Sequence, residues 1–417
     1  MNGYEPGAAV RRLGGCLAAI VLLLTACAAP PPPPLLPRAP GMGHAAKLRQ
    51  TEARFVEATG AKLRAVTQEL AVLRSWVGDV DGAVTAFRTV GIPSDMSAPD
   101  LSEDRAEAAI AAIVREAETR QIVILNEAHH VPVHRAFAMR LARELRRIGF
   151  EYLACETFSN MPGLGTSPIT RNTGYYSQDP VFAEFLRETI RQRWTLMGYE
   201  HRAIEAEEGL SWAQREQRRE TGQAQNIVDG ILARHPSARI FVYAGYGHAA
   251  KTPFPTGEGQ PPLWMMASEL KRLSGIDPLS IDQSRMFALS ETALEASGYR
   301  MALARGSAEA PFVLRQTGGA YRLLGPAPGA YDMQVLHPPS VQSAGRVTWL
   351  RTLAERQSWP VPAAWVPANG RRLIYAVHEA DPPEAIPADI VTVEAGKPAP
   401  ALMLPPGRGF RFEFEDF

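Results

Sequence analysis

Residues 121–127 read Gln-Ile-Val-Ile-Leu-Asn-Glu, a short apolar run that ends in two polar residues. Such a run is typical of a strand that is buried on both faces, as the strands of parallel sheets are. Similar runs follow at residues 152–155, 194–199 and 239–244. Helical patterns separate the runs, and strands that alternate with crossover helices predict a parallel sheet flanked by helices. The predicted fold class is therefore α/β.

The predicted α/β domain covers residues 104–305. Its helical patterns fall at residues 106–118, 133–148, 179–193, 212–233 and 263–273. Before it lies a helical segment, residues 44–103. Apolar residues recur there at spacings of three and four and predict one long amphipathic helix over 44–76, whereas residues 79–103 are expected to be irregular.

A β-rich extension is predicted for residues 306–417. Gly318 and Gly319 separate two apolar runs, which favours a hairpin. A helix is expected near 346–356 and a strand at 372–377, and the last residues alternate strictly between aromatic and charged side chains. A C-terminal β-rich extension, together with the N-terminal long helix, therefore completes the predicted organisation.

The first residues of the chain have the pattern of an export signal. Arg11 and Arg12 precede an apolar run from Leu13 to Leu24, and small residues lead to Cys27. This pattern predicts a lipoprotein signal peptide over residues 1–26, with Cys27 as the lipidation site. Residues 27–43 are rich in proline and predict a semi-rigid tether. We therefore expect a lipid-anchored protein of the bacterial cell envelope, located at the outer membrane and facing the periplasm.

The composition limits the classes of function. The 417 residues contain 44 Lys plus Arg and 44 Asp plus Glu, so the formal net charge is zero and no nucleic-acid partner is expected. The chain is 46% hydrophobic and 21% charged, which excludes a wholly disordered protein. Three cysteines are too few for a disulfide scaffold. Cys155 lies in an apolar strand, which favours a buried structural thiol over a nucleophile.

Polar side chains follow the predicted strands at the points where they end. Glu127, Glu156, Glu200 and His248 each follow one of the four strands. The carboxyl ends of parallel strands share one edge of a sheet, where open α/β sheets bind their ligands. Glu and His suit general acid–base catalysis or metal ligation. One such residue alone is more often a helix cap or a surface residue, but four at one edge predict a functional site.

Several motifs around these residues resemble one superfamily, which joins the erythromycin esterases, the ChaN-like haem-uptake lipoproteins and the Tiki-type proteases. The ChaN-like branch is the most similar, and the resemblance covers roughly residues 105–285. The matching residues are Glu127, His129, Pro132 and His134 in the first motif, Glu156 in the second, Arg219, Ala224 and Asn226 in a helix motif, and Ala244, Gly245, Gly247 and His248 in the last.

The chain also departs from the motifs of this superfamily. Asn126 stands where the ChaN-like motif has Gly, and His130 and Val131 replace Asp-Asn. The doubled histidine allows a second register, since the esterase motif Gly-Glu-x-x-His-Gly would select His130. We prefer His129, because Pro132 and the histidine that follows it match the first register only.

Three functions are compatible with this sequence. In the first, the protein is a hydrolase of ester or peptide bonds, as the resemblance implies. The proposed catalytic residues are Glu127, His129, His130, Glu156 and His248, and the proposed ligand-binding residues are His134, Tyr199, Glu200, Arg219 and Tyr246. A variant of this hypothesis adds a divalent metal held by Glu127, His129, Glu156 and His248. The chain has neither a Gly-x-Ser-x-Gly elbow nor a His-Glu-x-x-His helix.

The second function is binding of haem or iron, which the ChaN-like relatives imply, with His or Tyr as the iron ligand. The third is a non-catalytic structural role in the envelope. The partners expected under these hypotheses are the membrane, through the lipid anchor, and a small-molecule or peptide substrate or haem. The sequence leaves the three alternatives open, because a shared fold does not transfer activity.

Overall fold

The computed structural model describes residues 31–87, 99–158, 164–165, 168–202, 209–257, 259–289, 295–296, 298–306, 309–325 and 328–417. The predicted signal peptide of residues 1–26 and the predicted lipidation site at Cys27 lie outside these residues. Residues 34–417 form one compact unit, and the rest of the description concerns this unit. Within the described residues, no helix is both long and apolar enough to cross a membrane.

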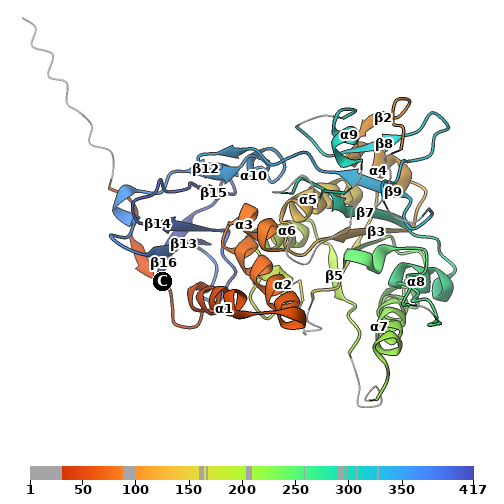
Figure 1. Ribbon diagram of the computed structural model, residues 1–417, viewed down its shortest axis with the longest axis horizontal. Helices are drawn as coiled ribbons and strands as arrows, with labels where there is room; N and C mark the ends of the chain where they lie inside the picture. The colour runs from red at the N-terminus through yellow and green to blue at the C-terminus, as the bar shows by residue number, and fades with distance from the viewer. Residues whose placement is uncertain are drawn as a thin grey trace, which may run out of the picture. The chain divides into compact units, whose positions relative to one another are not determined.

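An eight-stranded sheet lies at the centre of the unit (Figure 1). Its strands, in spatial order, are β2 (Arg105–Ala108), β8 (Phe312–Arg315), β9 (Met333–Leu336), β7 (Leu279–Met286), β3 (Ile122–Glu127), β6 (Ile240–Gly245), β4 (Tyr152–Cys155) and β5 (Thr195–Gly198). The strands from β9 to β5 run parallel to one another, and β8 is antiparallel to both of its neighbours. The predicted α/β class with a parallel sheet flanked by helices is confirmed.

Helices cover both faces of this sheet. One face packs against α4 (Ala109–Ala117), α5 (Val133–Arg147) and α6 (Pro180–Arg191), and the other against α7 (Trp212–Ile227) and α8 (Met266–Ser274). Side chains of a strand alternate between faces. In β3, Val123 and Leu125 therefore join the first core and Ile122 and Ile124 the second. All four side chains are fully buried, as the apolar run predicted.

The sheet differs from the sequence prediction at its edges. Residues 105–108 form β2, so the helix that was predicted over 106–118 begins at Ala109. β7 was not predicted, because polar side chains interrupt its apolar pattern. The glycine turn at 318–319 is closed by a bridge between Arg315 and Tyr321 and by backbone hydrogen bonds, but residues 321–324 form no regular strand, and β8 pairs with β2 and β9. The central sheet thus extends beyond the residue range 104–305.

The predicted single helix over residues 44–76 is wrong, because two helices form there. α1 (Ala45–Glu57) ends where Ala58 and Thr59 adopt extended backbone, and α2 (Gly60–Trp76) begins at a glycine with a φ of +56°. That φ favours glycine. Residues 80–87, which were expected to be irregular, form the helix α3 (Val80–Phe87).

The C-terminal residues build a second, four-stranded sheet in the order β1-β16-β13-β14 (Figure 1). These strands are β1 (Leu35–Pro37), β13 (Arg371–His378), β14 (Asp389–Glu394) and β16 (Phe410–Asp416). β1 pairs in parallel with β16, so residues 35–37 of the predicted tether form a strand. One face of this sheet packs against α1 and α2 through Leu48, Leu70 and Trp76. The N-terminal helices and the C-terminal sheet therefore share one core.

Short elements complete the unit. They are α9 (Tyr299–Leu303), α10 (Trp349–Thr352), β10 (Gln342–Ser343), β11 (Arg346–Val347), β12 (Gln357–Trp359) and β15 (Leu402–Leu404). The helix predicted near 346–356 is therefore shorter than expected and follows a strand. β10 pairs with β11, and β12 with β15.

A buried ion pair links β14 to the segment before α10. Both oxygens of Asp389 accept hydrogen bonds of 2.9 Å from Arg346, and Asp389 also accepts one of 2.7 Å from the Met403 backbone. We expect Asp389→Ala to lower the free energy of unfolding by about 3–5 kcal/mol, since it leaves a buried guanidinium unpaired. Urea denaturation measures this loss. Glu394→Ala, on the same strand but in an exposed pair with Lys397, should cost no more than about 0.5 kcal/mol. Equal losses in both variants would contradict the assignment.

Candidate active site

The candidate site lies at the carboxyl ends of three adjacent strands. β6 lies between β3 and β4, although it follows both in sequence. Glu127 is the last residue of β3, Glu156 follows the end of β4, and Gly245 ends β6. A 3₁₀ turn, Tyr246–Ala249, then carries His248. The topology therefore brings three of the sequence-predicted strand-end residues to one place, as expected for a parallel sheet.

Glu127 is a buried carboxylate with four polar contacts. Arg135 on α5 donates to both of its oxygens, at 2.9 and 3.1 Å, and the Tyr243 hydroxyl donates at 2.8 Å. Nδ1 of His129 lies 2.8 Å from Oε1. Burial alone would raise the pKa of Glu127, but the Arg135 charge and the His129 hydrogen bond outweigh it and lower the pKa. Glu127 is therefore ionised at neutral pH.

His129 is held between Glu127 and two aromatic rings. Its imidazole stacks on Tyr176 at a centroid distance of 3.7 Å and meets the Tyr246 ring edge-on at 4.9 Å. Its other edge lies over Gly245, where a Cβ would come within 2.4 Å of Cε1 and 2.6 Å of Nε2. Residue 245 must therefore be glycine for His129 to sit there. Gly245, a matching residue of the last motif, therefore makes room for a side chain of the site.

Glu156 follows the end of β4 and lies beside Gly245, in the same small cavity as Glu127 and His129. The Gly245 backbone N–H donates to its Oε2 at 2.6 Å, and Arg219 on α7 donates to its Oε1 at 2.9 Å. Nε2 of His248 lies 3.6 Å from the same Oε1. Burial would raise the pKa of Glu156, but the charges of His248, His129 and Arg219 lower it. Glu156 is thus an ionised group between two histidines.

His248 is enclosed by two carboxylates. In addition to Glu156, Glu220 on α7 places Oε1 at 2.7 Å from Nδ1 of His248, and the second oxygen of Glu220 accepts the N–H of Met266 at the start of α8. Burial would lower the pKa of His248, but Glu156 and Glu220 raise it to about 9. His248 is therefore a cation at neutral pH. Glu220, which follows Arg219 in the chain, was not among the predicted site residues.

Arg219 connects the site to the end of β5. Its Nε donates to Glu200 at 3.0 Å, while Nη2 reaches both Glu156 and Glu200. Gln223 also donates to Glu200, at 3.0 Å. Glu200 and Arg219 were both predicted as ligand-binding residues. The structure brings them together as a pair that orients Glu156.

An open cavity of about 570 Å³ lies against His248 and Arg219. A volume of this size is typical of small-molecule sites. Its walls also include His130, Tyr246 and Glu220, and its remaining residues are mostly apolar. A much smaller cavity of about 10 Å³ lies on the other side of the Gly245 turn, between Glu127, His129 and Glu156. The predicted catalytic residues thus divide between two adjoining cavities.

Two further predicted residues, His130 and Tyr246, have different environments. His130 is buried and stacks on Phe87 at 3.9 Å, and burial lowers its pKa to about 3. Tyr246 adopts a left-handed φ of 39°, and its carbonyl accepts a hydrogen bond of 2.7 Å from Asn126. Asn126, which replaces the glycine of the ChaN-like motif, also donates to Asp282 on β7. This asparagine therefore fixes the turn that carries His248.

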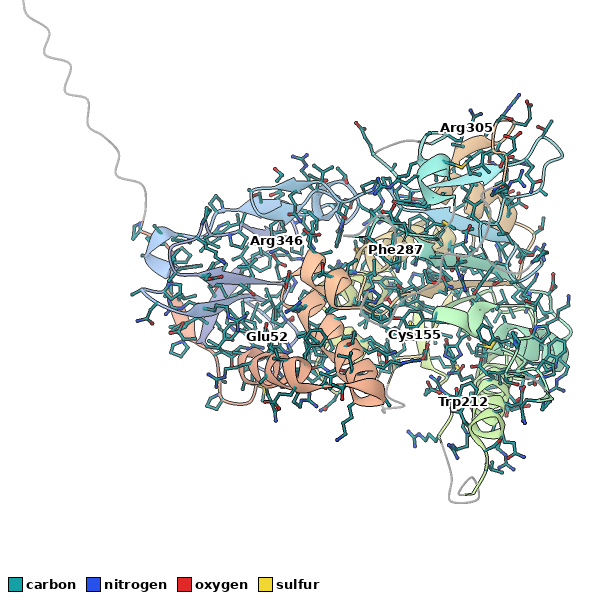
Figure 2. The ribbon with its side chains drawn as sticks, in the orientation of Figure 1. Glu52, Cys155, Trp212, Phe287, Arg305 and Arg346 are labelled. Carbon is teal, nitrogen blue, oxygen red and sulfur yellow. The ribbon has the colours of Figure 1, made fainter. Side chains whose placement is uncertain are left out.

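Two predicted ligand-binding residues lie inside the protein instead of in a cavity wall. His134 is fully buried, and its Nδ1 accepts the N–H of Ala128 at 3.1 Å. Tyr199 is also fully buried, and its hydroxyl donates to the carbonyl of Tyr243 at 3.2 Å. Both side chains hold loops of the site in place. Cys155 is buried and unpaired, and burial raises its pKa, which confirms the predicted structural thiol (Figure 2).

The predicted metal set does not fit this geometry. Within the described part of the chain, no group of three or more His, Cys, Asp or Glu side chains is arranged to hold a metal ion. The reason is local: Arg135 and Tyr243 occupy the oxygens of Glu127, and Arg219 occupies Glu156. His248 itself is a poor candidate for a haem ligand. Both nitrogens of His248 face carboxylates, and a protonated imidazole cannot ligate iron.

Sequence reasoning missed the residues that reach the site from neighbouring elements. Arg135, Tyr243 and Tyr176 all contact Glu127 or His129. Arg135 carried a signal, because it shares the apolar stripe of α5 with Ala138 and Ala142 and is fully buried. A charged residue on a buried stripe requires a partner of opposite charge.

Comparisons with known proteins add little to this description. No family model matches the chain, and no curated protein matches it significantly. Among solved structures, the type III effector HopBA1 has a TM-score of 0.30 at 15% sequence identity. The aligned region covers 48% of this chain and 89% of the HopBA1 chain. A structure described as "Bacterial protein toxins" has a TM-score of 0.31 at 14% sequence identity. The aligned region covers 54% of this chain and 46% of that chain. Likenesses this weak carry no argument about function.

The raised pKa of His248 makes a prediction about stability. Its folded-state pKa of about 9 exceeds the ordinary value of 6.5, so its contribution to stability is complete below pH 6.5 and is lost as the pH rises toward 9. The difference in unfolding free energy between the native protein and His248→Gln should shrink by up to about 3 kcal/mol over this window.

Urea denaturation at several pH values measures this difference. His235→Gln, at an exposed position, is the matched control and should give a pH profile parallel to that of the native protein. A difference between native protein and His248→Gln that stays constant or grows with pH would show that His248 is not held as a cation.

Proposed function

We propose that the protein is a hydrolase that cleaves an ester or peptide bond at the carboxyl edge of β3, β6 and β4. The observation that carries this proposal is the contact of 2.8 Å between Nδ1 of His129 and the buried, ionised Glu127. A carboxylate that accepts from Nδ1 leaves Nε2 free to act as a base, which is the arrangement of catalytic His–acid pairs. The resemblance to erythromycin esterases and Tiki-type proteases supports the same reaction class.

The proposed mechanism divides the work between the two histidines. His129 takes a proton through Nε2 from a water in the small cavity beside Gly245, and the resulting hydroxide attacks a substrate carbonyl held beside His248 in the larger cavity. Arg219 and the cationic His248 stabilise the negative charge that develops on the carbonyl oxygen. His248 then donates its proton to the leaving group, and the acid product and the alcohol or amine are released. Glu156 lies 3.6 Å from Nε2 of His248, and its charge also interacts with that of His129.

This proposal predicts that His129 is required for hydrolysis. Against a panel of p-nitrophenyl butyrate and fluorescein-labelled casein, His129→Ala should lower kcat/KM by about 10²- to 10⁴-fold, the usual contribution of a general base. His235→Ala, an exposed histidine away from the site, should leave kcat/KM unchanged. Turnover by His129→Ala at the native rate would overturn the assignment of the base.

Gly245→Ala tests the same site without removing a functional group. Its added Cβ would lie 2.4 Å from the His129 ring, so we expect a loss comparable to that of His129→Ala. Gly247→Ala is the matched control, because its Cβ meets only the flexible end of Met265 at 3.2 Å. Thermal unfolding of both variants separates a displaced histidine from a misfolded chain.

We also propose that this hydrolase is a lipoprotein of the bacterial envelope, at the outer membrane and facing the periplasm. The apolar run that ends in small residues and Cys27 supports this location. Metabolic labelling with radioactive palmitate in a bacterial host should mark the native chain and not Cys27→Ser, whereas Cys155→Ser should be labelled normally. Labelling of Cys27→Ser would disprove the anchor.

A further inference from the structure

The 570 Å³ cavity beside His248 has two chemically distinct parts. Its charged residues include Glu216, Arg219, Glu220 and His248, which contact one another or Glu156 and so form one cluster. The apolar remainder of the wall comprises Val84, Phe87, Ala128, Trp212, Ala250, Pro253, Phe254, Pro255, Leu263, Met265, Phe287, Leu289 and Ala330. We call these parts the charged cluster and the apolar wall.

The apolar wall comes from four separate regions of the unit. Phe87 ends α3, Trp212 begins α7, Phe287 follows β7, and Phe254 lies in the loop before α8. Figure 2 shows Trp212 and Phe287 on different elements, and both line the cavity. Segments far apart in the sequence therefore converge to enclose apolar space. The side chains of Trp212 and Phe254 are also 57% and 54% exposed, although large apolar residues are usually covered.

This lining selects among substrate classes. A peptide in extended conformation needs rows of backbone donors and acceptors, and a sugar needs polar groups around its hydroxyls. The apolar wall offers few such groups, and the charged cluster has room for one polar head beside His248 and Arg219. An alkyl chain gains from the apolar wall because its burial removes hydrocarbon from water.

We propose that the substrate is an amphiphilic acyl ester, with its carbonyl at the charged cluster and its hydrocarbon chain along the apolar wall. This inference rests on the proposed hydrolase function and names its substrate class. Each methylene that enters the wall should improve kcat/KM by about fourfold until the cavity is filled. Trp212 and Phe254 act as specificity-determining residues at the exposed part of the wall.

The test uses p-nitrophenyl acetate, butyrate, octanoate and dodecanoate with residues 28–417, which contain the whole compact unit 34–417. We expect kcat/KM to rise at least 100-fold from acetate to the octanoate or dodecanoate. Trp212→Ala and Phe254→Ala should lower the ratio of kcat/KM for the dodecanoate to kcat/KM for the acetate by about tenfold. Trp264→Ala is the matched control, since this residue is 44% exposed in the same loop region but does not line the cavity.

A binding measurement separates this inference from the proposed function. Fluorescence titration with dansyl-undecanoic acid needs no turnover, and both the native protein and His129→Ala should bind it, with weaker binding in Phe254→Ala. Binding without hydrolysis of any ester would reject the hydrolase and keep the acyl site. Hydrolysis that does not depend on chain length, together with no binding of the probe, would reject the acyl site and keep the hydrolase.

Discussion

The buried guanidinium of Arg135 is the constraint on which the site depends. Its side chain is fully buried on α5, where an isolated charge would cost several kcal/mol. Glu127 at the end of β3 and Asp179, which caps α6, neutralise it. The charge of Arg135 on α5 thereby holds the end of β3 and the start of α6 against α5. The same pairing keeps Glu127 ionised, and an ionised Glu127 is what orients His129.

The alternation of side chains along the strands then distributes the functional groups. Glu127 points to the face covered by α5, and Glu156 points to the face covered by α7, where Arg219 meets it. Between them lies β6, which ends in Gly245 and leaves space for the His129 ring to cross the edge. β6 comes later in the sequence than β3 and β4 but lies between them. It therefore joins the part of the site on the α5 face, at Glu127, to the part on the α7 face, at Glu156.

These relations explain what the sequence could predict. The apolar runs of β3, β4 and β6 identified those strands, and position after a strand identified Glu127, Glu156 and His248. β7 was missed because Asp282 and neighbouring polar residues are buried in hydrogen bonds to Asn126, which a pattern of hydropathy does not reveal. Arg135 and Tyr243 were missed because they act across elements. Tyr199 was placed at the edge correctly but packs inward, since side-chain direction depends on tertiary contacts.

The contrast between His130 and His248 shows that carboxylate partners can reverse the effect of burial on the charge of a histidine at this edge. Both imidazoles are buried, but Phe87 covers His130 and its pKa falls to about 3, whereas two carboxylates surround His248 and its pKa rises to about 9. Environments that separate the pKa values of like groups create distinct acid and base roles. His248 lies where the apolar wall ends, and under the proposed hydrolysis its charge would face a developing oxyanion in a setting of low polarity, where such an interaction is strong.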